Sequence, residues 1–191
     1  MRPGPPSAPE PHPGILRLAR RRSRSCNPSR AAIHQLLSDA RGQALVVFDV
    51  NLRPPFIDAD AVAATFRVAD VVKMSESEVA RLSTLLDRPP LIRWLLQDAG
   101  VRAVCVTRGK GGASFTTVHG TVSTPGMQID TSAGDAVGAG DAFTAAMAHQ
   151  LIRNATPEET LQAANRYAAL VATKKGAMPM VSSDELAALG F

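Results

Sequence analysis

The chain of 191 residues has few cysteines and no long apolar runs. Its two cysteines, Cys26 and Cys105, are too few for a disulfide framework, which favours a reducing, cytoplasmic setting. No apolar run approaches the ~20 residues that cross a bilayer, so we expect no membrane partner. The four histidines share no metal-ligand spacing. The sequence contains no Cys-x-x-Cys pair, which argues against a metal or redox site built on paired cysteines. It also contains no Gly-x-x-x-x-Gly-Lys-Ser/Thr segment, which argues against a P-loop.

Basic charge is concentrated near the N-terminus. Residues 1–30 contain seven arginines, one glutamate and seven of the 14 prolines, so they carry a formal charge of +6 while the whole chain carries +4. This composition favours disorder, and we expect an arm over residues 1–28 and a folded domain over residues 29–191. A nucleic-acid-binding arm and an organelle transit peptide are alternatives. The preferred interpretation is a leader without function or a misassigned start of the coding sequence.

The rest of the chain alternates between strand-like and helix-like patterns. Near-continuous apolar runs such as residues 44–50 are typical of strands buried on both faces. Residues 156–159, Thr-Pro-Glu-Glu, predict a helix start with a capping box. The alternation predicts an α/β domain with a mainly parallel sheet. We expect strands over residues 44–50, 68–74, 101–107, 113–118 and 121–123, a hairpin turn at 109–112, and helices over 29–41, 58–67, from 75, and over 90–97, 141–153, 157–174 and 183–189.

The most informative stretch is residues 135–143, Asp-Ala-Val-Gly-Ala-Gly-Asp-Ala-Phe. Small residues let the backbone turn tightly, and the apolar run after Asp141 predicts a helix whose first N–H groups suit a phosphate. A carboxylate there can accept a proton from a hydroxyl that attacks the phosphate. A helix cap is the simpler interpretation of Asp141. The near repeat of residues 133–136 at 139–142, of which only the second opens a long apolar helix, favours a kinase site with Asp141 as the reactive carboxylate.

This stretch resembles the C-terminal signature of the PfkB family of ribokinase-like carbohydrate kinases, Asp-Thr-x-Gly-Ala-Gly-Asp-x-Phe, with Ala136 where Thr is usual. Three upstream segments match other family motifs in the same order. Residues 49–54 resemble the Asp-x-Asn-x-Arg-Pro segment of fructokinase-type members, residues 75–78 the Asn-x-x-Glu motif, and residues 107–109 the Thr-x-Gly strand end. The resemblance runs from about residue 29 to the end. It implies a layered α/β/α fold that is truncated on its N-terminal side and lacks the family's β lid.

The resemblance also implies an activity, the ATP-dependent phosphorylation of a sugar hydroxyl, of the fructokinase type. In that reaction Asp141 is the base, and the backbone amides of Gly138, Ala139, Gly140 and Asp141 form the anion hole for the transferring phosphoryl group. The nucleotide-binding positions that the resemblance assigns are Thr107, Gly109 and Asn165. The positions that it assigns to the active-site cleft are Asp49, Asn51 and Arg53.

Two cation sites are implied in the same way. Glu78 matches the glutamate that helps to hold the hydration shell of Mg²⁺, although Ser75 stands where Asn is commonest. A capping box over residues 75–78 is the structural alternative, and the two roles are compatible. Asp135 and the carbonyl of Val137 resemble a site for a monovalent cation such as K⁺, and a turn residue that bonds its own backbone is the alternative for Asp135.

In the family that this chain resembles, most residues that bind the sugar belong to the N-terminal half, which this sequence does not match. We therefore expect phosphoryl-transfer machinery with an incomplete acceptor pocket, and leave open whether this chain is active, weakly active or inactive. The expected partners are ATP and a small sugar, with a homodimer as a further expectation. The alternatives are a catalytically silent nucleotide-binding or interaction module and, less favoured, a nucleic-acid binder that uses the basic arm.

Overall fold

The computed structural model describes residues 15–18, 27–55, 57–130, 132 and 134–190. Its centre is a six-stranded sheet whose strands follow each other in chain order. The first four strands are parallel, and the last two are joined to them as an antiparallel hairpin. The strands are β1 (Ile15–Leu18), β2 (Leu45–Asp49), β3 (Val71–Ser75), β4 (Ala103–Thr107), β5 (Ala113–Thr117) and β6 (Gly120–Thr124).

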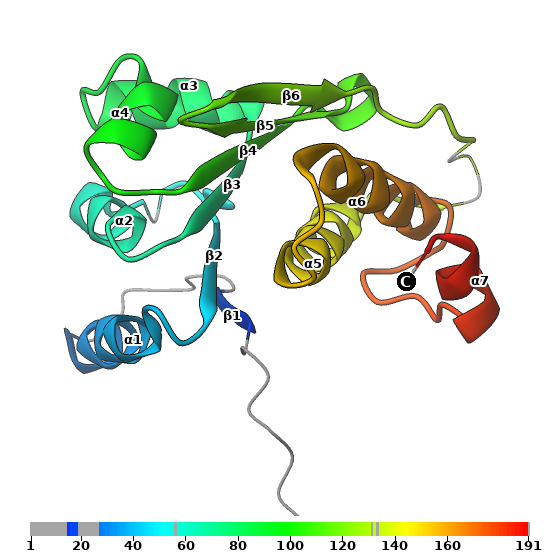
Figure 1. The fold of residues 1–191 in the computed structure, drawn as a ribbon, viewed down its shortest axis with the longest axis horizontal. Helices are drawn as coiled ribbons and strands as arrows, with labels where there is room; N and C mark the ends of the chain where they lie inside the picture. Colours follow the sequence, from blue (N-terminus) through cyan, green and yellow to red (C-terminus); the bar gives the residue numbers. More distant parts are fainter. Residues whose placement is uncertain (1–14, 19–26, 56, 131, 133, 191) are drawn as a thin grey trace, which may run out of the picture.

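Helices cover both faces of the sheet (Figure 1). One face carries α1 (Asn27–Ala40), α2 (Ala59–Phe66), α3 (Glu76–Leu85) and α4 (Leu91–Gln97). The other face carries α5 (Ala139–Ile152) and α6 (Pro157–Ala172), and the short α7 (Ser183–Ala188) follows. The expected layered α/β/α architecture with a mainly parallel sheet is therefore confirmed.

The central strands are apolar throughout because successive side chains enter different cores. On β2, Val46 packs into the core beneath α1 to α4, and the next residue, Val47, packs into the core beneath α5 and α6. Val72 and Val71 on β3 divide in the same way. This two-sided burial is what the continuous apolar runs in the sequence predicted.

Most expected elements are present within a few residues of their predicted bounds. The predicted turn at 109–112 contains a short 3-10 helix, η1 (Gly109–Gly111), between the antiparallel strands β4 and β5. The capping box at the start of α6 is confirmed: the Thr156 hydroxyl accepts the Glu159 N–H, and the Glu159 carboxylate accepts the Thr156 N–H.

Strand β1 corrects the predicted domain boundary. It lies within residues 1–28, which were expected to form an arm, and its four residues pair with β2 in parallel register. The folded domain therefore includes residues before 29. The rest of the predicted arm up to residue 26 lies outside the described residues.

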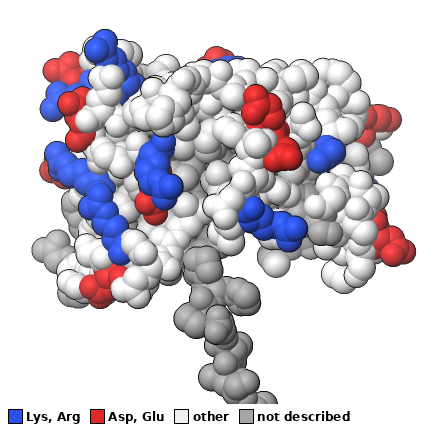
Figure 2. Space-filling model, in the orientation of Figure 1, with Lys and Arg blue, Asp and Glu red and all other residues white. Residues whose placement is uncertain are grey.

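The surface of the described part gives two further observations. None of its helices is long and apolar enough to pass through a bilayer. On the face shown in Figure 2, small groups of basic and of acidic side chains are scattered over a mostly uncharged surface. That face therefore has no continuous field of one sign.

Candidate active site

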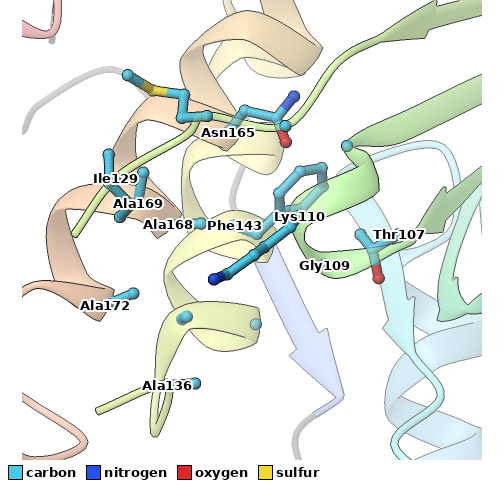
Figure 3. Close-up of a pocket in the computed structure, with 15 residues that line it drawn as sticks. Thr107, Gly109, Lys110, Ile129, Ala136, Phe143, Asn165, Ala168, Ala169 and Ala172 are labelled. Carbon is cyan, nitrogen blue, oxygen red and sulfur yellow. The ribbon is translucent and has the colours of Figure 1, made fainter. Parts of the chain in front are cut away.

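The candidate site lies at the edge of the sheet where the parallel strands β2, β3 and β4 end. Open α/β sheets place ligands at this edge. A cavity of about 280 Å³ opens here between η1, α5 and α6 (Figure 3). Its lining comes from segments far apart in the sequence: Thr107, Gly109, Lys110, Gly112, Gly126, Met127, Ile129, Ala136, Ala139, Gly140, Phe143, Asn165, Ala168, Ala169 and Ala172.

The turn into α5 needs glycine at Gly138. Its φ is 83°, in the left-handed region that favours glycine. A Cβ built there would overlap the Ala177 carbonyl oxygen and lie 3.0 Å from the carbonyl carbon. The turn is thus packed directly against the backbone that follows α6, and this packing fixes where α5 begins.

The residues that were predicted to form the anion hole lie at the first turn of α5. The first four N–H groups of a helix have no intrahelical acceptor. The N–H of Ala142 donates to the Gly138 carbonyl, and that of Ala139 donates to the Ala136 carbonyl at 3.2 Å. The amides of Gly140 and Asp141 follow in this first turn, and Ala139 and Gly140 line the cavity. In this structure the Ala139 N–H already donates within its own turn, so of the predicted donors we retain the amides of Gly140 and Asp141 as candidates.

Asp141 occupies the third position of α5, where its carboxylate is half-buried. A negative charge in the first turn is favoured by the helix dipole. The side chain that the sequence predicts as the base therefore lies in the same helix turn as the amides that were predicted to bind phosphate.

Asp135 connects the loop before α5 to the segment after α6. One of its carboxylate oxygens accepts the Val137 N–H and the other accepts the Gly176 N–H, each at 3.0 Å. The Asp135 N–H in turn donates to the Lys174 carbonyl at 3.2 Å. The predicted turn bond is thus present together with a longer-range bond. Carboxylate and carbonyl oxygens in one tight loop are also the donor type that an alkali cation accepts.

Glu78, the predicted magnesium residue, connects two loops. Its Oε1 accepts the Leu52 N–H at 2.7 Å, and its Oε2 accepts the N–H and the hydroxyl of Ser75 at 2.7 and 2.8 Å. Its partner Ser75 pairs across β3 and β4 with Thr107, which lines the cavity. Because both oxygens already accept hydrogen bonds, the arrangement fits a magnesium ion held through water. Among the described residues, no three His, Cys, Asp or Glu side chains form a direct metal site.

The three residues predicted for the cleft, at and just after the end of β2, have different surroundings in the structure. Asp49 is buried and ion-paired with Lys73, its Oδ1 lying 3.1 Å from the Lys73 Nζ. Asn51 shapes the turn, with φ at 43°. Arg53 is exposed and donates to the Leu52 carbonyl. The structure thus places Asp49 beneath the site, and leaves Arg53 at the surface.

The three positions that were predicted to bind the nucleotide all line the cavity. Thr107 and Gly109 form one wall of the cavity, and Asn165 on α6 forms the opposite wall (Figure 3). The Asn165 side chain donates to the Thr124 hydroxyl at 2.8 Å, so it is held by β6. Asn165 is half-buried.

Lys110 was missed by the sequence reasoning. It lies on η1, and its side chain extends into the cavity (Figure 3). Only its charge in the turn after β4 pointed to it, and that turn was interpreted as a plain hairpin. Arg108, in contrast, donates to Glu76 and to the Ser114 hydroxyl, each at 3.1 Å.

Cys105 lies on β4, fully buried behind the site. Burial raises the pKa of its thiol to about 12, against an opposing effect of the Lys73 ammonium. The thiol is therefore neutral at ordinary pH and has no nucleophilic role.

An open parallel sheet with a cavity at its carboxyl edge and a helix N-terminus beside it is typical of α/β nucleotide-binding proteins. The sequence narrows this class. Residues 16–184 match the pfkB family carbohydrate kinases, and the chain belongs to that family.

Individual relatives agree with this assignment. The chain is 31% identical to a probable fructokinase-3 of Arabidopsis thaliana, over 86% of this chain and 50% of the relative. It is also 31% identical to a putative fructokinase-8 of the same plant, over 82% of this chain and 80% of that relative. A crystal structure of a fructokinase with bound ATP from Xylella fastidiosa superposes with a TM-score of 0.72 at 26% identity, covering 84% of this chain and 56% of that one.

A second solved structure, of a putative ribokinase II from E. coli in complex with ATP and Mg²⁺, has a TM-score of 0.71 at 27% identity. It covers 83% of this chain and 52% of that one. The chain therefore spans about half the length of several proteins that it resembles. The family and its fold are established, and the activity of this chain is a matter for proposal.

Proposed function

We propose that the chain carries the phosphoryl-transfer site of an ATP-dependent sugar kinase of the fructokinase type. Its family consists of carbohydrate kinases, and several relatives are named fructokinases. The observation that carries the proposal is local: Asp141 and the Gly140 amide share the first turn of α5, and Gly140 lines the cavity.

The two ends of the cavity differ in polarity, and this difference favours one orientation of a bound nucleotide. The α6 side, with Ala168, Ala169 and Asn165, is mostly apolar and suits the flat base. The opposite end, at Lys110 and Gly140, offers an ammonium group and the N-terminus of a helix, which suit phosphates. ATP is therefore proposed to lie with its terminal phosphate at the start of α5.

At that point Asp141 acts as general base. Its carboxylate accepts the proton of the sugar hydroxyl as the hydroxyl oxygen forms a bond to the γ-phosphorus. The bond between the γ-phosphorus and the bridging oxygen breaks, and ADP keeps that electron pair. The amides of Gly140 and Asp141 stabilise the charge on the phosphoryl oxygens during transfer.

Two cations complete the proposal. Glu78 would hold a magnesium ion through water, and such an ion would neutralise phosphate charge. Asp135 and the Val137 carbonyl would hold a monovalent cation such as K⁺ in the loop that Asp135 ties to Gly176. The bonds that Asp135 makes to the Val137 and Gly176 N–H groups orient the segment that leads to Gly138 and Gly140.

The test is an assay of the purified chain with Mg-ATP and a panel of ketoses, aldoses and nucleosides, in which ADP and sugar phosphate are both measured. We expect product from the wild-type chain and a loss of at least ~100-fold in Asp141→Asn. Asp130→Asn is the matched control, because Asp130 is an exposed carboxylate that accepts the Ser132 N–H in its own loop and does not line the cavity. Equal rates in the two variants would contradict the role of Asp141.

The second candidate, a silent nucleotide-binding module, is favoured by the share of the relatives that the chain covers, about half in several cases. ATP binding without any sugar phosphate would establish it in place of the kinase. A failure to bind ATP would overturn both.

A further inference from the structure

Lys73 does not fit the pattern of its strand. Its neighbours on β3, Val71, Val72 and Met74, are apolar and buried, and Lys73 itself is only 8% exposed. A buried ion pair is weak support for stability, because apolar side chains of similar volume are often as good or better in its place. The charge at this position therefore calls for an explanation other than core stability.

The charged pair belongs to a row that crosses the sheet. In register, Asp49 on β2 lies beside Lys73 on β3, which lies beside Cys105 on β4. The Lys73 ammonium donates to both oxygens of Asp49, at 3.1 and 3.3 Å. The row faces α5 and α6, since Cys105 packs into their core. The pair is thus fixed to the sheet directly below the helices that form the site.

One hydroxyl joins this pair to the first turn of α5. Thr144 is buried, and its Oγ1 donates to Asp49 Oδ2 at 2.7 Å and to the Gly140 carbonyl at 2.9 Å, so one proton is shared between two acceptors. On the other side, the Lys73 Nζ lies 3.5 Å from where a Cβ of Gly140 would stand. The hydrogen bond ends on the Gly140 carbonyl, whose peptide group carries the Asp141 N–H of the proposed anion hole.

We propose that Asp49, Lys73 and Thr144 act together as a positioning cluster that fixes the peptide of Gly140 to the sheet. They set the direction of the amides that receive the terminal phosphate. The inference rests on the proposed function. Its specific consequence is that the cluster affects the affinity for a nucleotide with a γ-phosphate more than the affinity for one without it.

The experiment measures the dissociation constants of ATP and ADP by calorimetry, in Mg²⁺, on the full chain. Thr144→Val removes the hydroxyl with little change of shape. Thr160→Val is the matched control, because Thr160 is also a buried helix threonine and its hydroxyl has no hydrogen-bond partner among the described residues. Thr144→Ser restores a hydroxyl and is the rescue variant.

We expect the wild-type chain and Thr160→Val to bind ATP more tightly than ADP. In Thr144→Val that preference should fall about tenfold, as for the loss of one hydrogen bond that involves a charged group, and Thr144→Ser should recover most of it. A purely structural role would lower the melting temperature and change both affinities by the same factor, which would overturn the inference.

The outcomes separate the inference from the proposed function. If the wild-type chain binds neither nucleotide, the proposed function fails and the inference fails with it. If it binds both equally, the inference fails, and the proposed function is still decided by the sugar-phosphate assay. If the wild-type chain prefers ATP and Thr144→Val keeps the full preference, only the inference fails. Should Thr144→Val not fold, Asp49→Asn, which is nearly isosteric, carries the same measurement and the same criteria.

Discussion

Replacement of Gly138 by alanine tests how the turn before α5 is built. At φ 83° an alanine costs about 1–2 kcal/mol in backbone conformation. Its Cβ would also overlap the backbone at Ala177, and such overpacking costs about 1–3 kcal/mol. We therefore expect Gly138→Ala to lower the free energy of unfolding by roughly 2–5 kcal/mol, a large part of the stability of a single domain.

Two other glycines separate these contributions. Gly176 has φ 87° but nothing within 4 Å of a Cβ, so Gly176→Ala should show the backbone cost alone. Gly140 lies within the helix, and its Cβ would make only an ordinary contact with Lys73. Gly140→Ala should therefore leave stability unchanged or raise it by about 0.5–1 kcal/mol.

The assay is urea denaturation of all three variants, with the midpoint and the slope fitted for each. The expected order of stability is Gly140→Ala at or above wild type, then Gly176→Ala, then Gly138→Ala. Equal losses in Gly138→Ala and Gly176→Ala would refute the close packing of the α5 turn on the segment after α6.

The other predictions concern single side chains of the site. Lys110→Met should weaken ATP binding about 10–100-fold and leave adenosine binding unchanged, while Lys110→Arg keeps most of the affinity; equal loss of adenosine would contradict a phosphate contact. Glu78→Gln should raise the Mg²⁺ concentration needed for half-maximal ATP binding, and an unchanged Mg²⁺ titration would contradict its role. Because the pKa of Cys105 rises from 9.0 to about 12 on folding, the unfolded chain loses this proton first, so stability should fall above pH 9 by up to ~1.4 kcal/mol per pH unit. Cys105→Ala should remove that part of the slope between pH 9 and 11, and identical slopes would show that the thiol is not buried in this way.

Local sequence patterns were enough to predict most of the fold. Apolar runs on β2, β3 and β4 mark strands buried on both faces, and the capping residues of α6 mark its start because their bonds are local. Strand β1 was missed because Ile15–Leu18 is only four residues long and lies between proline-rich and arginine-rich segments. Its pairing with β2 is a long-range contact that composition does not show.

The sequence could point to the part of the candidate site that one continuous segment forms. Residues 138–141 carry the turn, the helix start and the carboxylate together. The contacts that depend on register could not be predicted in the same way. Lys73 meets Asp49 only because β2 and β3 align these two positions, and Thr144 meets Asp49 across 95 residues of chain. The position of Lys110 in the cavity depends likewise on α6 and η1, which are distant in the sequence, lining the same cavity.

The central claim is that ATP places its terminal phosphate on the first turn of α5. The most direct measurement is a ¹H–¹⁵N spectrum of the labelled chain, titrated with ATP, ADP and AMP in Mg²⁺. The amides of Gly140 and Asp141 should shift with ATP and progressively less with ADP and AMP, while Asn165 should respond to all three. Equal responses of Gly140 and Asp141 to AMP and ATP, or none to either, would contradict the account.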